Sequence, residues 1–275
     1  NGAFVGDWLV DDPRVGLVNF TGSADTGKSI AATAAKHLTS YEFELGGNDP
    51  FIVCADGDLE LALKEAGDKA RNAGQCCSAA KRFIVHNSLK EEFCRRLVDE
   101  YLKPLCLGDP FDEKTTMGPV ISERAAKRVI EQVELTVSQG AKVYYGGKRN
   151  GAFVDPTVLV DVDATMDVAK NMEIFGPVWP VFGFDTVDEA IELANLTDYG
   201  LSSGVFTKDM KTAARFCREI KAGYVTVNGS GGFRAAELPF GGGKKLTGNS
   251  RESLMTMMDE LTQKKSIILR YILED

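Results

Sequence analysis

The sequence predicts an α/β fold built on a largely parallel sheet. Short apolar segments typical of buried strands, such as residues 51–53 and 225–227, alternate with segments whose apolar residues recur at helical spacing. Glycines end several of the helical segments, among them Gly74, Gly140 and Gly223. Strands that alternate with helices usually pair in parallel, because a parallel pair needs a long crossover connection.

The first strand and helix enclose a tight turn. Residues 15–20 form a short apolar run, Gly22 and Ser23 follow, and an alanine-rich helical segment begins near residue 30. This order presents backbone N–H groups and the positive end of the helix dipole to a phosphate. The turn is therefore a candidate phosphate-binding site.

The second strand, residues 41–45, places a carboxylate next to a turn. Gly46 and Gly47 follow Glu44 almost directly and allow the backbone to bend sharply. A carboxylate at the end of a strand can face a cleft, so Glu44 is a candidate functional residue.

The remaining elements continue the alternation. Ser88 with Glu91, and Thr186 with Glu189, have the spacing of capping boxes and predict two helix starts. The further strands that we expect are residues 82–86, 141–145 and 201–207, and the further helices are residues 59–73, 122–139 and 210–220.

Two adjacent cysteines follow the helical segment that ends at Gly74. A thiol in such a loop is exposed enough to react, and a thiolate attacks electrophilic carbon once the local field lowers its pKa. Cys77 is therefore a candidate nucleophile. The alternative is that Cys76 and Cys77 are two small buried hydrophobic residues, as most free cysteines are.

Residues 22–29 open a different interpretation. Their sequence, GSADTGKS, matches the phosphate-loop pattern GxxxxGK[ST], with Lys28 and Ser29 in the nucleotide-contacting positions. A nucleotide triphosphatase is thus an alternative function. A plain helix start with a solvated lysine is the simpler explanation of the same octet.

The composition narrows the classes of partner. The 275 residues carry 32 basic and 40 acidic side chains, a net charge of −8, which argues against nucleic acid or an anionic membrane as a partner. No apolar run approaches a membrane span. The six cysteines and two histidines lack metal-ligand spacing, so we expect no metal site and a reduced, cytoplasmic setting. We expect Cys94, Cys106 and Cys217 to be structural residues in the packed core.

Five short motifs span nearly the whole chain. They are Phe20-Thr21-Gly22-Ser23, Glu44-Leu45-Gly46-Gly47, Gly74-Gln75-Cys76-Cys77, Glu173-Ile174-Phe175-Gly176-Pro177 and Pro239-Phe240-Gly241-Gly242. In this order they resemble the motifs of the aldehyde dehydrogenase superfamily, and they are more specific than the phosphate-loop octet, part of which they also explain. The chain resembles the C-terminal half, or slightly more, of a family member, and Asn48 is also found in semialdehyde-type members.

The resemblance implies an enzyme that oxidises an aldehyde to a carboxylic acid and passes hydride to NAD or NADP. Cys77 would form a thiohemiacetal and then a thioester, and Glu44 would activate the water that hydrolyses it. The resemblance further assigns the cofactor pyrophosphate to Gly22 and Ser23, the nicotinamide ribose to Glu173, and packing beside the nicotinamide ring to Phe175.

Two residues would contact the substrate by the same resemblance. Phe240 would line the aldehyde tunnel, and Arg234, six residues earlier, is near positions that contact substrate in the family. An arginine there suits an aldehyde that carries a carboxylate, such as succinic semialdehyde. A solvated surface arginine is the alternative.

The resemblance also implies a division into three parts. Residues 1–45 would be the end of a Rossmann-like dinucleotide-binding domain, residues 46–249 the catalytic α/β domain, and residues 250–275 a C-terminal helix and an oligomerisation strand. The apolar segment 265–271 would pair with another subunit, giving a homodimer or homotetramer. A non-catalytic scaffold of the same fold, acting through oligomerisation, is an alternative to the enzyme.

Overall fold

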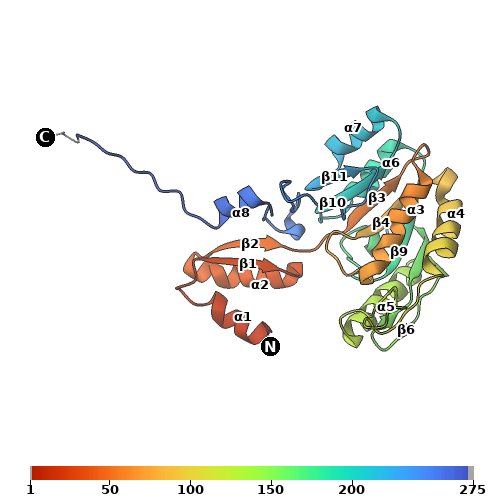
Figure 1. The fold of residues 1–275 in the computed structure, drawn as a ribbon, viewed down its shortest axis with the longest axis horizontal. Coiled ribbons are helices and arrows are strands. Elements are labelled where there is room, and N and C mark those ends of the chain that lie inside the picture. Colours follow the sequence, from red (N-terminus) through yellow and green to blue (C-terminus); the bar gives the residue numbers. More distant parts are fainter. Residues whose placement is uncertain (1, 272–275) are drawn as a thin grey trace.

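The computed structural model describes residues 2–271 (Figure 1). A two-stranded parallel sheet near the amino terminus is separate from a seven-stranded sheet of order β11-β10-β3-β4-β9-β8-β5. In the larger sheet every neighbouring pair of described strands is parallel except β5 with β8. The α/β fold with a largely parallel sheet is thus confirmed.

Strands and helices alternate over most of the chain, as the sequence predicts, but strands follow one another within residues 40–53 and 142–162. The strands are β1 (Leu17–Thr21), β2 (Ser40–Glu44), β3 (Asp49–Val53), β4 (Ala80–His86), β5 (Lys142–Tyr145), β6 (Arg149–Asn150), β7 (Phe153–Val154), β8 (Thr157–Val162), β9 (Val178–Phe184), β10 (Ser202–Phe206) and β11 (Tyr224–Val227). The helices are α1 (Gly2–Val10), α2 (Ala24–Ala34), α3 (Leu59–Asp68), α4 (Asn87–Arg96), α5 (Glu123–Ser138), α6 (Val187–Asn195), α7 (Met210–Glu219) and α8 (Leu254–Glu260), with shorter helical turns η1 (Ala35–His37), η2 (Lys69–Asn72), η3 (Leu97–Leu102), η4 (Asp167–Ala169) and η5 (Lys245–Thr247).

Helix α2 connects the parallel strands β1 and β2, which makes these residues one βαβ unit. The helix begins at Ala24, earlier than expected, because Ser23 caps it and accepts the N–H of Thr26 at 3.3 Å. The N-cap thus outweighs the low helix propensity of Thr26 and Gly27. Leu45 and Phe43 of the β2 segment pack with Ala24 as a small separate core.

The central strands of the larger sheet are buried and mostly apolar beyond their first residues, as expected where helices cover both faces. All five residues of β3 and of β10 are buried, and α4 and α6 both contact β4 and β9. Because β3, β4, β9 and β10 run parallel, the segments that precede them meet at one edge of the sheet. We call this the amino edge, and it positions the site described below.

Arg82, near the start of β4, holds the amino edge together. Its side chain is buried, and its guanidinium donates to the carbonyls of Asn48, Ala169, Leu193 and Ala194. A buried cation is tolerated only where such acceptors satisfy it. One side chain thereby fixes the segments that enter β3 and β9 to the end of α6.

Of the two capping boxes expected from the sequence, one is confirmed and one is wrong. Thr186 and Glu189 form the expected capping box of α6. The box at Ser88 and Glu91 does not form, because the imidazole of His86 caps α4 and accepts the N–H of Ser88 at 3.2 Å.

The expectation of buried structural cysteines holds for only one of three. Cys94 is buried, whereas Cys106 and Cys217 are exposed. Cys217 directly follows the buried Phe216, and one residue turns a helix by about 100°, which carries its side chain away from the core. Cys106 lies beyond the last turn of η3, in a connecting segment.

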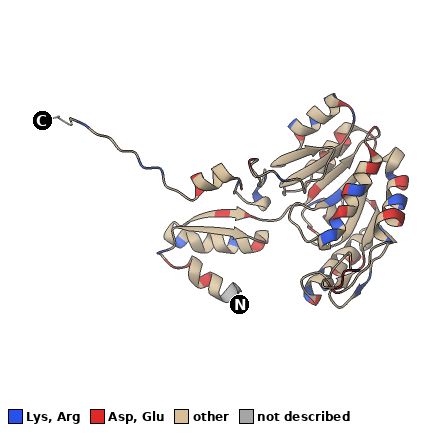
Figure 2. Cartoon of the chain, in the orientation of Figure 1, with Lys and Arg blue, Asp and Glu red and all other residues tan. Residues whose placement is uncertain are grey.

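The surface and the C-terminal segment add three observations. Acidic and basic residues are interspersed on α3 and α4 (Figure 2). None of the described helices combines the length and the apolar character needed to cross a membrane.

Residues 265–271 are exposed, form no described strand and extend away from the body (Figure 1). Pairing of this segment with another subunit, and the boundaries of the three parts, remain predictions.

Replacing Arg82 with lysine should destabilise the fold by about 3 kcal/mol, because one ammonium cannot reach the four carbonyls that the guanidinium fork satisfies. Chemical denaturation measures this loss. Arg96→Lys is the matched control, since Arg96 pairs with the more exposed Glu60 and Glu100 and should lose less than about 1 kcal/mol. Equal losses in the two variants would contradict the role assigned to Arg82.

Candidate active site

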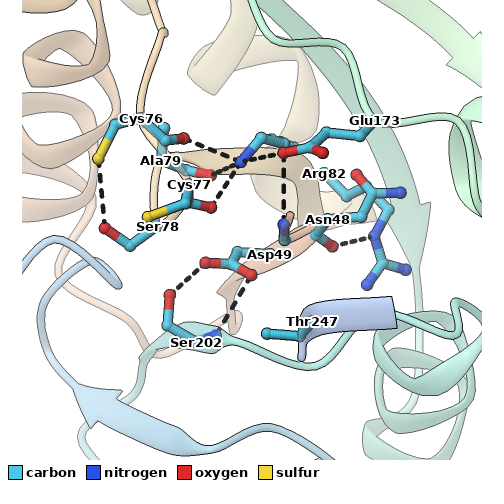
Figure 3. Close-up of polar contacts among 12 residues, drawn as sticks. Asn48, Asp49, Cys76, Cys77, Ser78, Ala79, Arg82, Glu173, Ser202 and Thr247 are labelled. Atoms are coloured by element: carbon cyan, nitrogen blue, oxygen red, sulfur yellow. Dashed lines mark hydrogen bonds and ion pairs between the residues drawn. The ribbon is translucent and has the colours of Figure 1, made fainter. Parts of the chain in front are cut away.

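Four segments that are distant in the sequence converge at the amino edge of the sheet (Figure 3). They are residues 44–49, which lead into β3, residues 74–80, which lead into β4, residues 173–177, which lead into β9, and Ser202 at the start of β10. Four of the five sequence motifs contribute to this edge or to the strand end beside it.

The thiol loop, residues 74–79, is held in a fixed shape by its entry and by one side chain. Ala73 and Gly74 both have left-handed backbone angles, with φ of 47° and 69°, which reverses the chain after η2. The Gln75 side chain donates to the carbonyl of Pro119 at 3.3 Å and accepts the N–H of Ile121 at 2.8 Å. A Cβ on Gly74 would lie 2.1 Å from the Gly176 carbonyl oxygen, so glycine lets the two motifs touch.

The two thiols differ in exposure and acidity. Cys76 is exposed and its sulfur lies 3.5 Å from the Ser78 hydroxyl, whereas Cys77 is half-buried. Hydrogen bonding from Cys77 and from Ser78 lowers the pKa of the Cys76 thiol. The same hydrogen bond, together with burial, raises the pKa of Cys77. The two thiols therefore titrate as a coupled pair.

Lys81 is the central cation of the site. Its side chain is 1% exposed, and its Nζ donates to the carbonyls of Cys76 at 3.0 Å and Cys77 at 2.7 Å. The same Nζ lies 3.2 Å from Oε1 of Glu173 and 5.8 Å from the centroid of the Phe175 ring. Lys81 thus connects the thiol loop to the Glu173 motif.

Glu173 also contacts the paired glycines. Its Oε1 accepts the N–H of Gly47 at 3.3 Å, and a Cβ on Gly46 would lie 2.3 Å from its Oε2. Only glycine permits this approach of carboxylate and backbone. Phe175, two residues on, leaves 44% of its surface exposed, so that its ring can take a planar partner.

Asp49 is a second buried carboxylate at the amino edge. It accepts the hydroxyl and the backbone N–H of Ser202, the latter at 3.2 Å. Burial raises the pKa of Asp49 to about 7, although the Lys81 charge and the Ser202 hydrogen bonds oppose the shift. Asp49 is a fully partnered structural group.

Glu44, at the end of β2, is buried without a partner. It is 3% exposed, and neither carboxylate oxygen has a hydrogen-bond partner among the described residues. Burial raises the pKa of Glu44 to about 8. A buried polar group with free lone pairs is suited to hold a water molecule and to exchange a proton with it.

The β1–α2 turn lies beside Glu44, because the N–H of Gly22 donates to the Glu44 carbonyl at 3.1 Å. Ser23 caps α2, so the first N–H groups of the helix point at the position that an anion would occupy. This geometry does not favour the phosphate-loop interpretation. Residues 24–29 are helical, and the exposed Lys28 lies 3.7 Å from Asp25.

Phe240 and Arg234 belong to another segment that lies near Glu44. A Cβ on Gly241, next to Phe240, would lie 2.9 Å from Oε1 of Glu44. The Arg234 guanidinium stacks 3.6 Å from the Phe240 ring centroid and lies 3.5 Å from Glu252. Both residues line a cavity of about 270 Å³. Arg234 is therefore not a freely solvated arginine.

A larger cavity of about 730 Å³ lies against the thiol loop. It is lined by Cys76 and Ser78 from the loop, Arg71 from η2, and Phe233 from the segment after β11. Phe233 lines both cavities. The thiol loop and Arg234 thus face adjoining open space.

Sequence reasoning missed three charged residues of the site: Asp49, Lys81 and Arg82. The available signal was their position, since charged residues at the first positions of otherwise apolar strands need buried partners.

The family of this chain follows from its match to known proteins. The model of the aldehyde dehydrogenase family matches residues 1–267. The chain belongs to the aldehyde dehydrogenase family. The 3-sulfolactaldehyde dehydrogenase of Priestia aryabhattai is 39% identical over 270 residues, which are 98% of this chain and 56% of that protein. The chain thus spans about half the length of the curated relatives it matches.

Solved structures agree with this aldehyde dehydrogenase fold. A betaine aldehyde dehydrogenase from Staphylococcus aureus in complex with NAD+ superposes with a TM-score of 0.90 at 39% identity, covering 94% of this chain and 52% of that one. The glyceraldehyde-3-phosphate dehydrogenase GapN from Methanocaldococcus jannaschii complexed with NADP gives 0.88 at 37% identity, covering 94% and 56%.

The residues present fit part of a nicotinamide dinucleotide. The capped start of α2 at a βαβ turn suits a pyrophosphate, and the Glu173 carboxylate can accept ribose hydroxyls. The Gly46 cradle keeps that carboxylate in place.

Glu44→Gln should change how stability depends on pH. The folded state keeps the Glu44 proton up to about pH 8, whereas the unfolded chain loses it near 4.5, so wild-type stability falls as the pH rises between these values. Glutamine stays neutral. The Tm of the variant should therefore rise relative to wild type from pH 5 to pH 8, and Glu131→Gln on exposed α5 should show no such trend. A Tm difference that does not change with pH would contradict the burial of Glu44.

Proposed function

We propose that this chain forms the catalytic part of an NAD(P)-dependent enzyme that oxidises an aldehyde to a carboxylic acid. The observation that carries the proposal is the environment of the Glu44 carboxylate. Glu44 is a buried, unpartnered carboxylate beside a turn suited to a pyrophosphate, and two residues separate it from Gly47, where an added Cβ would lie 2.7 Å from the Cys77 carbonyl oxygen. The family supports the same activity.

In the proposed reaction, the Cys77 thiolate adds to the aldehyde carbon. The Lys81 ammonium favours a thiolate at the pair, because its charge adds to the lowering of the Cys76 pKa and opposes the rise of the Cys77 pKa. The backbone N–H of Cys77 would support the resulting oxyanion. When bound, the nicotinamide cofactor supplies the acceptor for the hydride that leaves this carbon.

Glu44 acts in the second half of the reaction. Its carboxylate takes a proton from water, and the water oxygen attacks the thioester on Cys77, which releases the acid and restores the thiolate. A pKa of about 8 leaves Glu44 able both to accept and to return a proton near neutral pH. Glu173 and Phe175 hold the ribose and the nicotinamide, and Gly22 and Ser23 hold the pyrophosphate.

The competing nucleophile is Cys76, the more acidic of the two thiols. We assign attack to Cys77 because its carbonyl accepts a hydrogen bond from Lys81, which in turn pairs with Glu173. The Cys76 sulfur lies by Ser78 on the wall of the larger cavity.

Cys77→Ala in the full-length protein should lower aldehyde-dependent NAD(P) reduction by at least about a thousandfold, because the proposed thioester forms on the Cys77 sulfur. Cys76→Ala is the matched control and should retain most activity. NADH or NADPH absorbance measures both. Activity that survives Cys77→Ala but not Cys76→Ala would reverse the assignment, and a wild type that reduces no cofactor with any aldehyde would favour the non-catalytic scaffold.

We further infer that the aldehyde carries an anionic group. Arg234 lines the cavity beside Phe240, and Arg71 lines the cavity beside the thiol loop. Either guanidinium can bind a carboxylate or sulfonate. The name of the sulfolactaldehyde dehydrogenase relative also denotes an anionic aldehyde.

Arg234→Gln should lower kcat/KM for succinic semialdehyde by about 30-fold, the value of one charge-assisted hydrogen bond, and leave butyraldehyde nearly unaffected. The ratio of the two kcat/KM values is the measurement. An equal loss for both aldehydes would indicate that Arg234 supports Phe240 rather than selecting the substrate.

We also infer that the protein is cytoplasmic and assembles through residues 265–271 as a homodimer or homotetramer. The six free cysteines and the exposed apolar side chains of Ile267, Ile268 and Leu269 support these inferences.

A further inference from the structure

Lys81 makes more contacts than support of a thiolate requires. Its Nζ donates to three carbonyls of the thiol loop, those of Cys76, Cys77 and Ala79, at 3.0, 2.7 and 3.3 Å. Three carbonyls of a four-residue stretch can converge on one atom only if the backbone is tightly curved. The ammonium therefore sets the shape of the loop as well as its charge.

The remaining contacts of Lys81 lie toward the cofactor side. Its Nζ is 3.2 Å from Oε1 of Glu173, and that same oxygen accepts the N–H of Gly47. A Cβ on Gly47 would in turn lie 2.7 Å from the Cys77 carbonyl oxygen. Lys81 thus links the carbonyls of the thiol loop to Glu173, and Glu173 in turn accepts the N–H of Gly47. Figure 3 shows Glu173 facing the backbone of the thiol loop.

We propose that Lys81 is a positioning residue that couples the thiol loop to Glu173, so that the thiols and the carboxylate of the ribose site hold one another in place. The proposal rests on the proposed function only for the role of Glu173 toward the ribose. The coupling itself concerns groups that lie in contact whether or not the protein oxidises aldehydes.

If Lys81 couples the two groups, removing the Lys81 charge and removing the Glu173 charge should shift the pKa of the thiols in opposite directions. The charged or titratable groups around the thiols are Lys81 on β4, Asp49 on β3, Glu173 before β9 and Tyr224 on β11. Loss of the Lys81 charge removes the cation that favours a thiolate. Loss of the Glu173 charge removes the anion that neutralises this cation, and so strengthens its effect on the thiols.

The test measures how fast iodoacetamide alkylates Cys76 and Cys77 in the full-length protein at a series of pH values. Mass spectrometry of the peptide that contains both cysteines detects the product. The midpoint is the pH at which the rate reaches half of its maximum. Lys81→Met should move the midpoint upward by about one pH unit, and Glu173→Gln should move it downward. Lys81→Arg should keep the midpoint near that of wild type, because it retains the charge.

Lys69→Met is the matched control. Lys69 is another buried lysine close to the loop, but it donates to the Val178 carbonyl and lies over the Trp179 ring, and burial lowers its pKa well below the usual value. Because its Nζ donates to the Val178 carbonyl and not to the thiol loop, its loss should leave the alkylation midpoint unchanged. A midpoint that Lys69→Met raises as much as Lys81→Met does would overturn the proposal.

A second readout measures the coupling to the cofactor. Lys81→Met and Glu173→Gln should each raise the KM for NAD(P) by about tenfold, and the double variant should be no worse than the worse single one, because both remove the same link. Additive effects on KM would overturn the proposal. If Lys81→Met does not fold, Glu173→Gln alone decides, since a midpoint that stays or rises would overturn the coupling. Failure of the proposed function would instead abolish turnover and leave the alkylation shifts intact.

Discussion

The candidate site depends on two adjacent buried cations, Lys81 and Arg82. Successive residues of a strand point to opposite sides of the sheet. The Lys81 ammonium and the Arg82 guanidinium, near the start of β4, therefore bind different partners. Arg82 binds four carbonyls around the entry to β3, and Lys81 binds the thiol loop and Glu173. An unsatisfied buried charge would cost several kcal/mol, so these segments must converge on the cations. The geometry of the site follows from that requirement.

Glycine makes the convergence possible, because the segments meet backbone to backbone or backbone to carboxylate. A Cβ on Gly74 would overlap the Gly176 carbonyl, and one on Gly241 would lie 2.0 Å from the Ser250 carbonyl oxygen. The short motifs along the chain are therefore the segments that pack against one another around the candidate site. Their glycines mark the places where another segment approaches closely, and the neighbouring Cys77, Glu44, Glu173 and Phe240 are the side chains that this packing presents.

The sequence predicts most elements of the fold, because apolar periodicity and capping residues are local properties of the chain. It does not predict which groups satisfy one another at the amino edge. The strand at residues 82–86 was expected, yet the fact that it begins at Ala80, with two buried cations, depends on carbonyls up to about a hundred residues away. At α4 the capping motif fails for a local reason, since the imidazole of His86 caps the helix by accepting the N–H of Ser88 two residues on. For the site, the motifs locate Cys77 and Glu44, whereas Lys81 has no motif of its own.

Three carboxylates of the site differ only in their surroundings, and this difference separates their chemistry. Asp49 is fully buried and hydrogen-bonded to Ser202, which makes it a structural acceptor. Glu173 is neutralised by Lys81 and reaches the surface in part, as a group that binds a ligand must. Glu44 alone is buried with both oxygens free, and desolvation alone is the main cause that moves its pKa toward neutrality. A proton acceptor needs a free lone pair and a pKa near the pH of its surroundings. Glu44 meets both conditions.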